Sequence, residues 1–134
     1  IEYSKKIFKN NITKIICISS ICGVESIDGA PIGYSIAKSA LNFYIKLISK
    51  ELANKNITIN GVVPGNIIFK GSTWDLKIKK NYMKTKKYIK NNVPINNFGT
   101  PNDIFEVCKM ISENRSKFIT GSLFKIDGGQ TKGF

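Results

Sequence analysis

KIICIS, at residues 14–19, is a short and continuous apolar run that is rich in β-branched residues. Such a run is typical of a strand that is buried on both faces. ITINGVV at residues 57–63 repeats the pattern, and SLFKID at residues 122–127 gives a third run. Because helical patterns separate these runs, the sequence predicts an α/β fold, with three parallel strands and flanking helices.

Three stretches between or beside the strands are predicted to be helical. Residues 34–55 form a long helix, and Phe43 and Leu47 add a second apolar face to it, so we expect both of its sides to be covered. Residues 75–92 form a lysine-rich helical segment, and Thr100 begins a further helix. Residues 1–10 look like the end of another amphipathic helix. The stripe expected to be buried on the long helix is Ala37, Leu41, Tyr44, Ile45, Ile48 and Leu52.

The composition is that of a single domain with a strong positive charge. The chain has 134 residues and a formal charge of +12, and Arg115 is its only arginine. The wealth of lysine, isoleucine and asparagine indicates an AT-rich coding sequence. Recognition of phosphates and bases favours arginine forks, which are missing here, so we expect no nucleic-acid partner.

The cysteines and the hydropathy limit the class of protein further. Cys17, Cys22 and Cys108 lie in apolar surroundings, form no CxxC pair and have no histidine beside them, so we expect buried thiols and no metal site. No apolar run approaches the roughly 18 residues that a membrane span needs. The start does not resemble a signal peptide, so we expect a cytoplasmic protein without a membrane partner.

A candidate acid/base pair lies in GYSIAKSAL, at residues 33–41. Tyr34 and Lys38 are four residues apart and share a helix face. An ammonium group beside a phenol favours the phenolate, and in a chain without histidine this pair is the best acid/base candidate. Tyr82 and Lys86 have the same spacing, but they lie in a lysine run and are interpreted as solvated surface.

Polar and glycine residues follow the first two strands at their ends. Ser19 and Ser20 end the first strand, and Pro64 and Gly65 end the second. Open α/β sheets bind ligands at the carboxyl ends of their strands, where a glycine allows the backbone to approach a flat ligand closely. We therefore expect Tyr34 and these strand ends to meet in one crevice.

Five motifs between about residue 12 and residue 130 resemble the short-chain dehydrogenase/reductase family in their order and spacing. They are ISS, YSIAK, ITINGVVPGNI, FGTP and FITGSLFKIDGG. The resemblance implies a Rossmann-like, doubly wound parallel sheet of which this chain is only the C-terminal half. Residues 1–134 would form one partial domain, and the dinucleotide-binding N-terminal portion would lie before residue 1.

The resemblance also implies roles for individual residues. Ser20 would orient the substrate carbonyl or alcohol, Tyr34 would be the general acid/base, and Lys38 would favour the phenolate and hold the nicotinamide ribose. The remaining cofactor contacts would be Pro64, Gly65 and Ile67. The implied cofactor is NAD or NADP, and the implied reaction is reversible hydride transfer with a small carbonyl/alcohol substrate.

Two departures from the family pattern and three alternatives remain. Phe69 stands where the family often has Thr, and Ser20 precedes Tyr34 by 14 positions, one more than is common, which leaves Ser19 as a substitute.

Trp74 either lines the substrate pocket or packs the lid. The doubly apolar helix fits the family habit of forming dimers or tetramers. The alternative to an enzyme is an inert fragment or a non-enzymatic interaction module.

Overall fold

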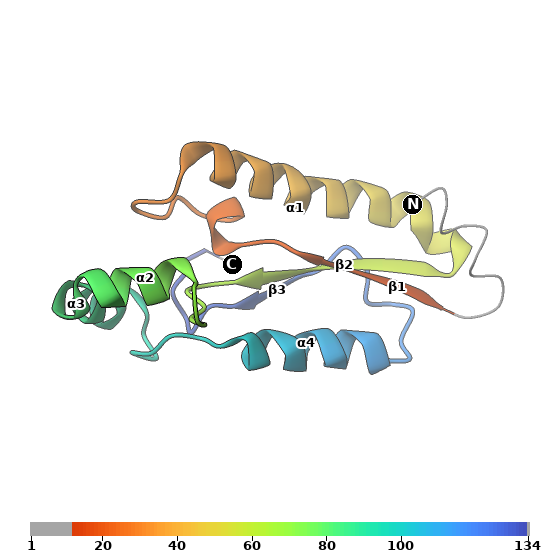
Figure 1. Cartoon of the computed structure of the whole chain (residues 1–134). Helices are drawn as coiled ribbons and strands as arrows, with labels where there is room; N and C mark the ends of the chain where they lie inside the picture. The colour runs from red at the N-terminus through yellow and green to blue at the C-terminus, as the bar shows by residue number, and fades with distance from the viewer. Residues whose placement is uncertain (1–11, 134) are drawn as a thin grey trace.

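The sheet has the predicted parallel topology. The computed structural model describes residues 12–133, so the helix expected at residues 1–10 lies outside the described part. Strands β1 (Thr13–Ile18), β2 (Ile57–Pro64) and β3 (Leu123–Ile126) are hydrogen-bonded in the order β1-β2-β3 (Figure 1). Both pairings are parallel, so the carboxyl ends of all three strands lie at the same end of the sheet.

Helices cover both faces of the sheet. Helix α1 (Ile32–Leu52) lies over one face and α4 (Pro101–Glu113) over the other (Figure 1). Two short turns flank α1: η2 (Ile21–Gly23) before it and η3 (Ala53–Lys55) after it. Together these elements form the three layers of an α/β domain. None of the described helices is long and apolar enough to cross a membrane.

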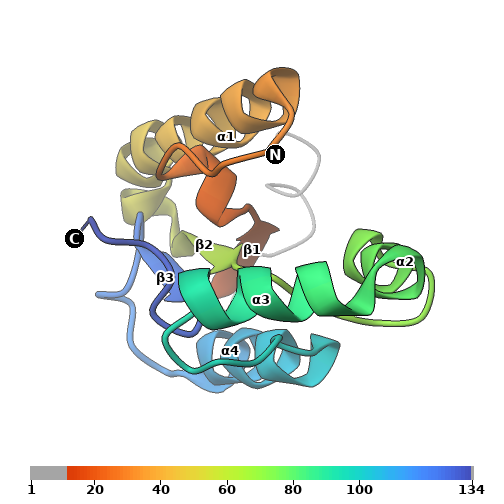
Figure 2. The same cartoon turned by 90° about the vertical axis from the view of Figure 1, so that its left-hand side faces the viewer.

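Two helices lie beyond the ends of the strands and form a lid. They are α2 (Thr73–Lys80) and α3 (Tyr82–Asn92), and Figure 2 shows α3 in front of the strand ends. The sequence predicted one helical segment here, whereas the structure breaks it at Asn81. The Asn81 side chain accepts a hydrogen bond of 2.9 Å from the backbone N–H of Lys84, which caps the second helix.

The core lies between α1 and the sheet. Ile45, Leu52, Ile57 and Ile59 are each at most 5% exposed and form one cluster. Burying each of these side chains stabilises the fold by roughly 1.5–3 kcal/mol. The apolar stripe predicted for α1 is therefore correct at Ile45 and Leu52.

Elsewhere on α1 the predicted buried face is wrong. Ala37 and Tyr44 are exposed, and the polar residues Asn42 and Ser49 are buried instead. Asn42 is tolerated inside because its side-chain amide donates to the carbonyl of Gly23, at 3.0 Å. Ser49 lies where Gly121 passes so closely that a Cβ there would be 2.5 Å from the serine oxygen.

Strand β1 and the thiols are less buried than expected. Residues 13–17 are only half-buried and Ile18 is 47% exposed, whereas Ile57–Val63 of β2 are buried. The reason is that β1 pairs with β2 alone within the described part of the chain, so its other edge is uncovered.

The three cysteines are free and half-buried, and partial burial raises the pKa of the Cys17 and Cys108 thiols.

The helix start predicted at Thr100 is confirmed. The Thr100 backbone N–H and hydroxyl both donate to the Asp103 carboxylate, at 2.6 and 2.7 Å, which is the carboxylate half of a capping box. Those hydrogen bonds lower the pKa of Asp103. The less exposed face of α4 consists of Ile104, Val107, Cys108 and Ile111.

Candidate active site

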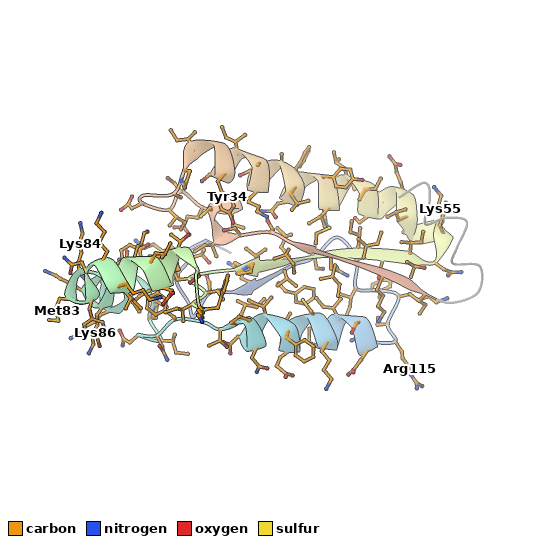
Figure 3. The ribbon with its side chains drawn as sticks, in the orientation of Figure 1. Tyr34, Lys55, Met83, Lys84, Lys86 and Arg115 are labelled. Carbon is orange, nitrogen blue, oxygen red and sulfur yellow. The ribbon has the colours of Figure 1, made fainter. Side chains whose placement is uncertain are left out.

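Tyr34 and Lys38 lie together at the beginning of α1. The Lys38 ammonium is 5.6 Å from the centroid of the Tyr34 ring. Lys38 also donates a hydrogen bond of 2.9 Å to the backbone carbonyl of Ile18, in the last residue of β1. Figure 3 shows Tyr34 on the side of α1 toward the sheet. The N-terminal part of α1 is thus tied to the end of β1.

Ser20 lies between that strand and the η2 turn. It is buried, at 7% exposure, and its hydroxyl oxygen accepts a hydrogen bond from the backbone N–H of Cys22, at 3.2 Å. That bond caps η2 and orients the serine side chain. Ser19, the possible substitute, is also buried, but its hydroxyl has no hydrogen-bond partner among the described residues.

Gly23 holds the serine-bearing turn against α1. Its carbonyl accepts hydrogen bonds from the side chains of Ser39 and Asn42, at 3.1 and 3.0 Å. A Cβ on Gly23 would lie 2.5 Å from the carbonyl carbon of Lys38. Only glycine allows this approach, so the turn that follows Ser20 packs directly on the backbone of Lys38.

The residues expected to meet the cofactor follow β2. Gly65 passes so close to β3 that a Cβ on it would be 2.7 Å from the Cα of Asp127, and its N–H donates to Ile126. Ile67 forms an isolated bridge with Gly99. Backbone packing therefore fixes the course of the chain from Pro64 to Ile67. Phe69, at the departure from the family pattern, is 55% exposed.

The C-terminal segment contacts the site through residues that no sequence motif marks. Asn66 donates a hydrogen bond of 2.6 Å to the side-chain oxygen of Gln130, and the backbone N–H of Lys132 donates to Glu25 at 2.8 Å. These pairs join the end of β2 and the loop after Ser20 to the chain beyond β3. Their partners are 64 and 107 residues apart, so no local motif signals them.

An aromatic cluster joins the two lid helices to the chain that follows them. The Trp74 ring is 5.1 Å from the Tyr88 ring and 5.4 Å from the Phe98 ring, measured between centroids. Trp74 therefore packs the lid, which is one of the two alternatives that the sequence left open. It also lines a groove on the lid. Among residues 12–133, no three His, Cys, Asp or Glu side chains are grouped so that they could hold a metal ion.

The fold and the site together define a class of protein. The parallel α/β sheet has a serine at the end of one strand, Tyr34 and Lys38 on the helix after it and a Pro-Gly turn at the end of the next strand. These are the features on which the resemblance to short-chain dehydrogenases/reductases rests. A family model described as enoyl-(acyl carrier protein) reductase matches residues 1–131. The chain belongs to this family, which confirms the resemblance seen in the sequence.

Curated relatives and solved structures agree with that assignment. The chain is 31% identical over 128 residues to a 3-oxoacyl-[acyl-carrier-protein] reductase of Rickettsia felis, covering 96% of this chain and 50% of the relative. It is 30% identical to nodulation protein G of Azospirillum brasilense, covering 96% of this chain and 49% of that protein. A structure of 4-hydroxyisoleucine dehydrogenase complexed with NADH superposes with a TM-score of 0.78 at 30% identity, covering 90% of this chain and 48% of that chain. The chain thus spans about half the length of the relatives it matches.

Proposed function

We propose that this chain supplies the catalytic half of an NAD(P)-dependent oxidoreductase that interconverts a small carbonyl compound and its alcohol. One observation carries the proposal: the Tyr34–Lys38 pair is tied to the end of β1, where Ser20 lies, through the bond from Lys38 to Ile18 and the packing of Gly23 on α1. Family membership and the relatives' names support the same reaction type.

In this proposal each residue performs one task. The Ser20 oxygen accepts a bond from Cys22, and its O–H is left to donate to the substrate oxygen. Tyr34, 44% exposed, transfers the proton to or from that oxygen. Lys38 places a positive charge beside the phenol, which favours the phenolate when the proton has left.

The residues present fit a nicotinamide cofactor. Lys38 donates one hydrogen bond to the carbonyl of Ile18, which leaves further N–H donors for the ribose hydroxyls. Pro64, Gly65 and Ile67 would hold the nicotinamide end, along backbone that β3 and Gly99 keep in place. The bound cofactor would supply the hydride, and NAD and NADP both fit this half of the site.

The test is a matched pair of tyrosine variants in the full-length protein. Tyr34→Phe keeps the ring and removes the hydroxyl, and we expect turnover to fall by about 100-fold or more while NADH or NADPH still binds. Tyr82→Phe, at the second Tyr-x-x-x-Lys pair, should retain normal turnover. The assay follows absorbance of the reduced cofactor with a panel of carbonyl substrates that includes a 3-oxoacyl thioester. Normal turnover by Tyr34→Phe would refute the assignment, and absence of turnover by the parent protein would favour the inert alternative.

We further propose that the outer face of α1 binds a second copy of the chain. Ile36, Phe43 and Leu47 lie seven and four positions apart along the helix and are 64%, 65% and 49% exposed. An apolar stripe of this kind on a helix usually marks an interaction surface. A dimer or a tetramer would cover it.

A further inference from the structure

A positively charged groove runs along the lid beside the candidate site. It has a volume of about 440 Å³, and its walls come from α2 and α3. The aromatic rings of Trp74 and Tyr88 line it together with three lysines, Lys77, Lys80 and Lys84. An apolar wall with several ammonium groups suits a ligand that has both a carbon skeleton and an anionic group.

Among residues 12–133, no carboxylate forms a salt bridge with the three lysines of the groove. Asp75 is the only acid in residues 73–92, and it is engaged by Lys79 in a salt bridge of 2.7 Å and by the backbone N–H of Gly71 at 2.9 Å. Within the described part of the chain, that salt bridge is the only one the lid lysines make. The Lys77 ammonium is held 4.3 Å from the centroid of the Trp74 ring, so it is positioned at the groove in advance.

Tyr88, in the wall of the groove, brings it close to the residues that follow β2. Burial raises the pKa of Tyr88, and hydrogen bonding to Gln130 and Asn66 opposes that effect, so the phenol lies beside the Asn66–Gln130 pair that follows β2. Figure 3 shows Lys84 on the side of the lid toward α1 and Tyr34, with Met83 and Lys86 on the opposite side. A substrate at Tyr34 could thus extend under the lid toward these lysines.

We propose that the groove is an anion subsite, and that the substrate of this oxidoreductase is a small carbonyl or alcohol compound with a phosphate ester at its far end. Lys77, Lys80 and Lys84 bind the phosphate, while Trp74 and Tyr88 pack against the carbon skeleton. Lysine binds phosphate as a point charge, and three ammonium groups match a dianion better than a single carboxylate. The substrate assignment rests on the proposed function, whereas the binding of phosphate by the groove does not.

The test is a calorimetric titration of the full-length protein with phenyl phosphate, without cofactor, and phenol is the neutral control. The groove variant Lys77→Gln/Lys80→Gln/Lys84→Gln is compared with Lys86→Gln/Lys87→Gln/Lys90→Gln, which removes the same charge from other faces of α3. We expect the groove variant to weaken phenyl phosphate binding by about tenfold or more. The matched variant should weaken it by less than about twofold, and thermal melting checks that both variants fold.

Three results would overturn the proposal: no binding of phenyl phosphate at millimolar concentration, equal weakening by the two triple variants, or binding of phenol as tight as that of phenyl phosphate. Equal weakening would show attraction by net charge alone. A protein that binds phenyl phosphate in the groove but never oxidises or reduces a carbonyl substrate would refute the proposed function and leave the phosphate site standing. In an active protein, the groove variant should raise KM for a phosphorylated substrate and leave kcat unchanged.

Discussion

Replacing Gly23 with alanine tests whether the packing of η2 on α1 positions Ser20. The added Cβ would lie 2.5 Å from the carbonyl carbon, 2.7 Å from the carbonyl oxygen and 2.8 Å from the Cβ of Lys38. Carbon atoms in contact prefer about 3.5–4.0 Å, so the turn or the helix must move by about 1 Å. Two of the three atoms belong to the helix backbone, which cannot rotate away as a flexible side chain could.

The expected cost has two parts. Overpacking of this kind destabilises a protein by about 1–3 kcal/mol. The same movement shifts Ser20 relative to Tyr34 and Lys38, and a displacement of about 1 Å in an active site can cost about 100-fold in rate. Urea unfolding and steady-state turnover of the full-length Gly23→Ala protein would measure the two parts separately.

Gly33→Ala is the matched control, because it makes the same change one residue before Tyr34. Nothing lies within 4 Å of a Cβ at Gly33, and alanine is the better helix former. The control should therefore be as stable as the parent, or slightly more stable, and equally active. A Gly23→Ala protein with parental stability would refute the steric argument. Lost stability with unchanged turnover would show that the packing does not position Ser20.

Two further predictions concern stability and assembly. Burial raises the pKa of Asp127, but hydrogen bonds from Thr131 and Gly129 outweigh that effect and the pKa is lowered overall. Because the folded pKa lies below the unfolded one, the carboxylate stabilises the fold above about pH 4 and the stabilisation is lost as the pH falls through the folded pKa. The difference in urea midpoint between the parent and Asp127→Asn should shrink on acidification, and a difference that does not change with pH would contradict this. On α1, Phe43→Glu should yield a smaller species in light scattering. Lys109→Glu, on α4 over the other face of the sheet, should not. An unchanged mass for Phe43→Glu would exclude this face as the interface.

The three strands and the start of α4 were predictable because local sequence determines them. Apolar runs set the strands to within about two residues, and Thr100 with Asp103 set the start of α4. The buried face of α1 was not predictable in the same way. Hydrophobicity favoured Tyr44 over Asn42, but the partner of Asn42 is the carbonyl of Gly23, 19 residues away, and only the folded turn brings them together.

Some residues of the candidate site could be predicted from the sequence and others could not. The family motif contains Ser20, Tyr34 and Lys38 in one segment of 19 residues, so sequence reasoning could select them before their contacts were known. The Asn66–Gln130 pair and the contact of Glu25 with Lys132 depend on where β3 delivers the C-terminal segment. Such contacts follow from the topology of the sheet rather than from any spacing along the chain.

The second tyrosine–lysine pair shows which property of the first one matters. Lys86 lies 5.7 Å from the Tyr82 ring centroid, and Lys38 lies 5.6 Å from that of Tyr34, so the two pairs have the same internal geometry. They differ in their surroundings: Lys38 is bonded to the end of β1 and packed beneath Gly23, whereas Tyr82 lies on the lid at 55% exposure. The electrostatic effect of a lysine on a neighbouring phenol is the same in kind at both places. The catalytic role proposed for Tyr34 therefore depends on the end of β1 and on the serine-bearing turn that packs on Lys38. For that reason Tyr82→Phe is the control that the Tyr34→Phe experiment requires.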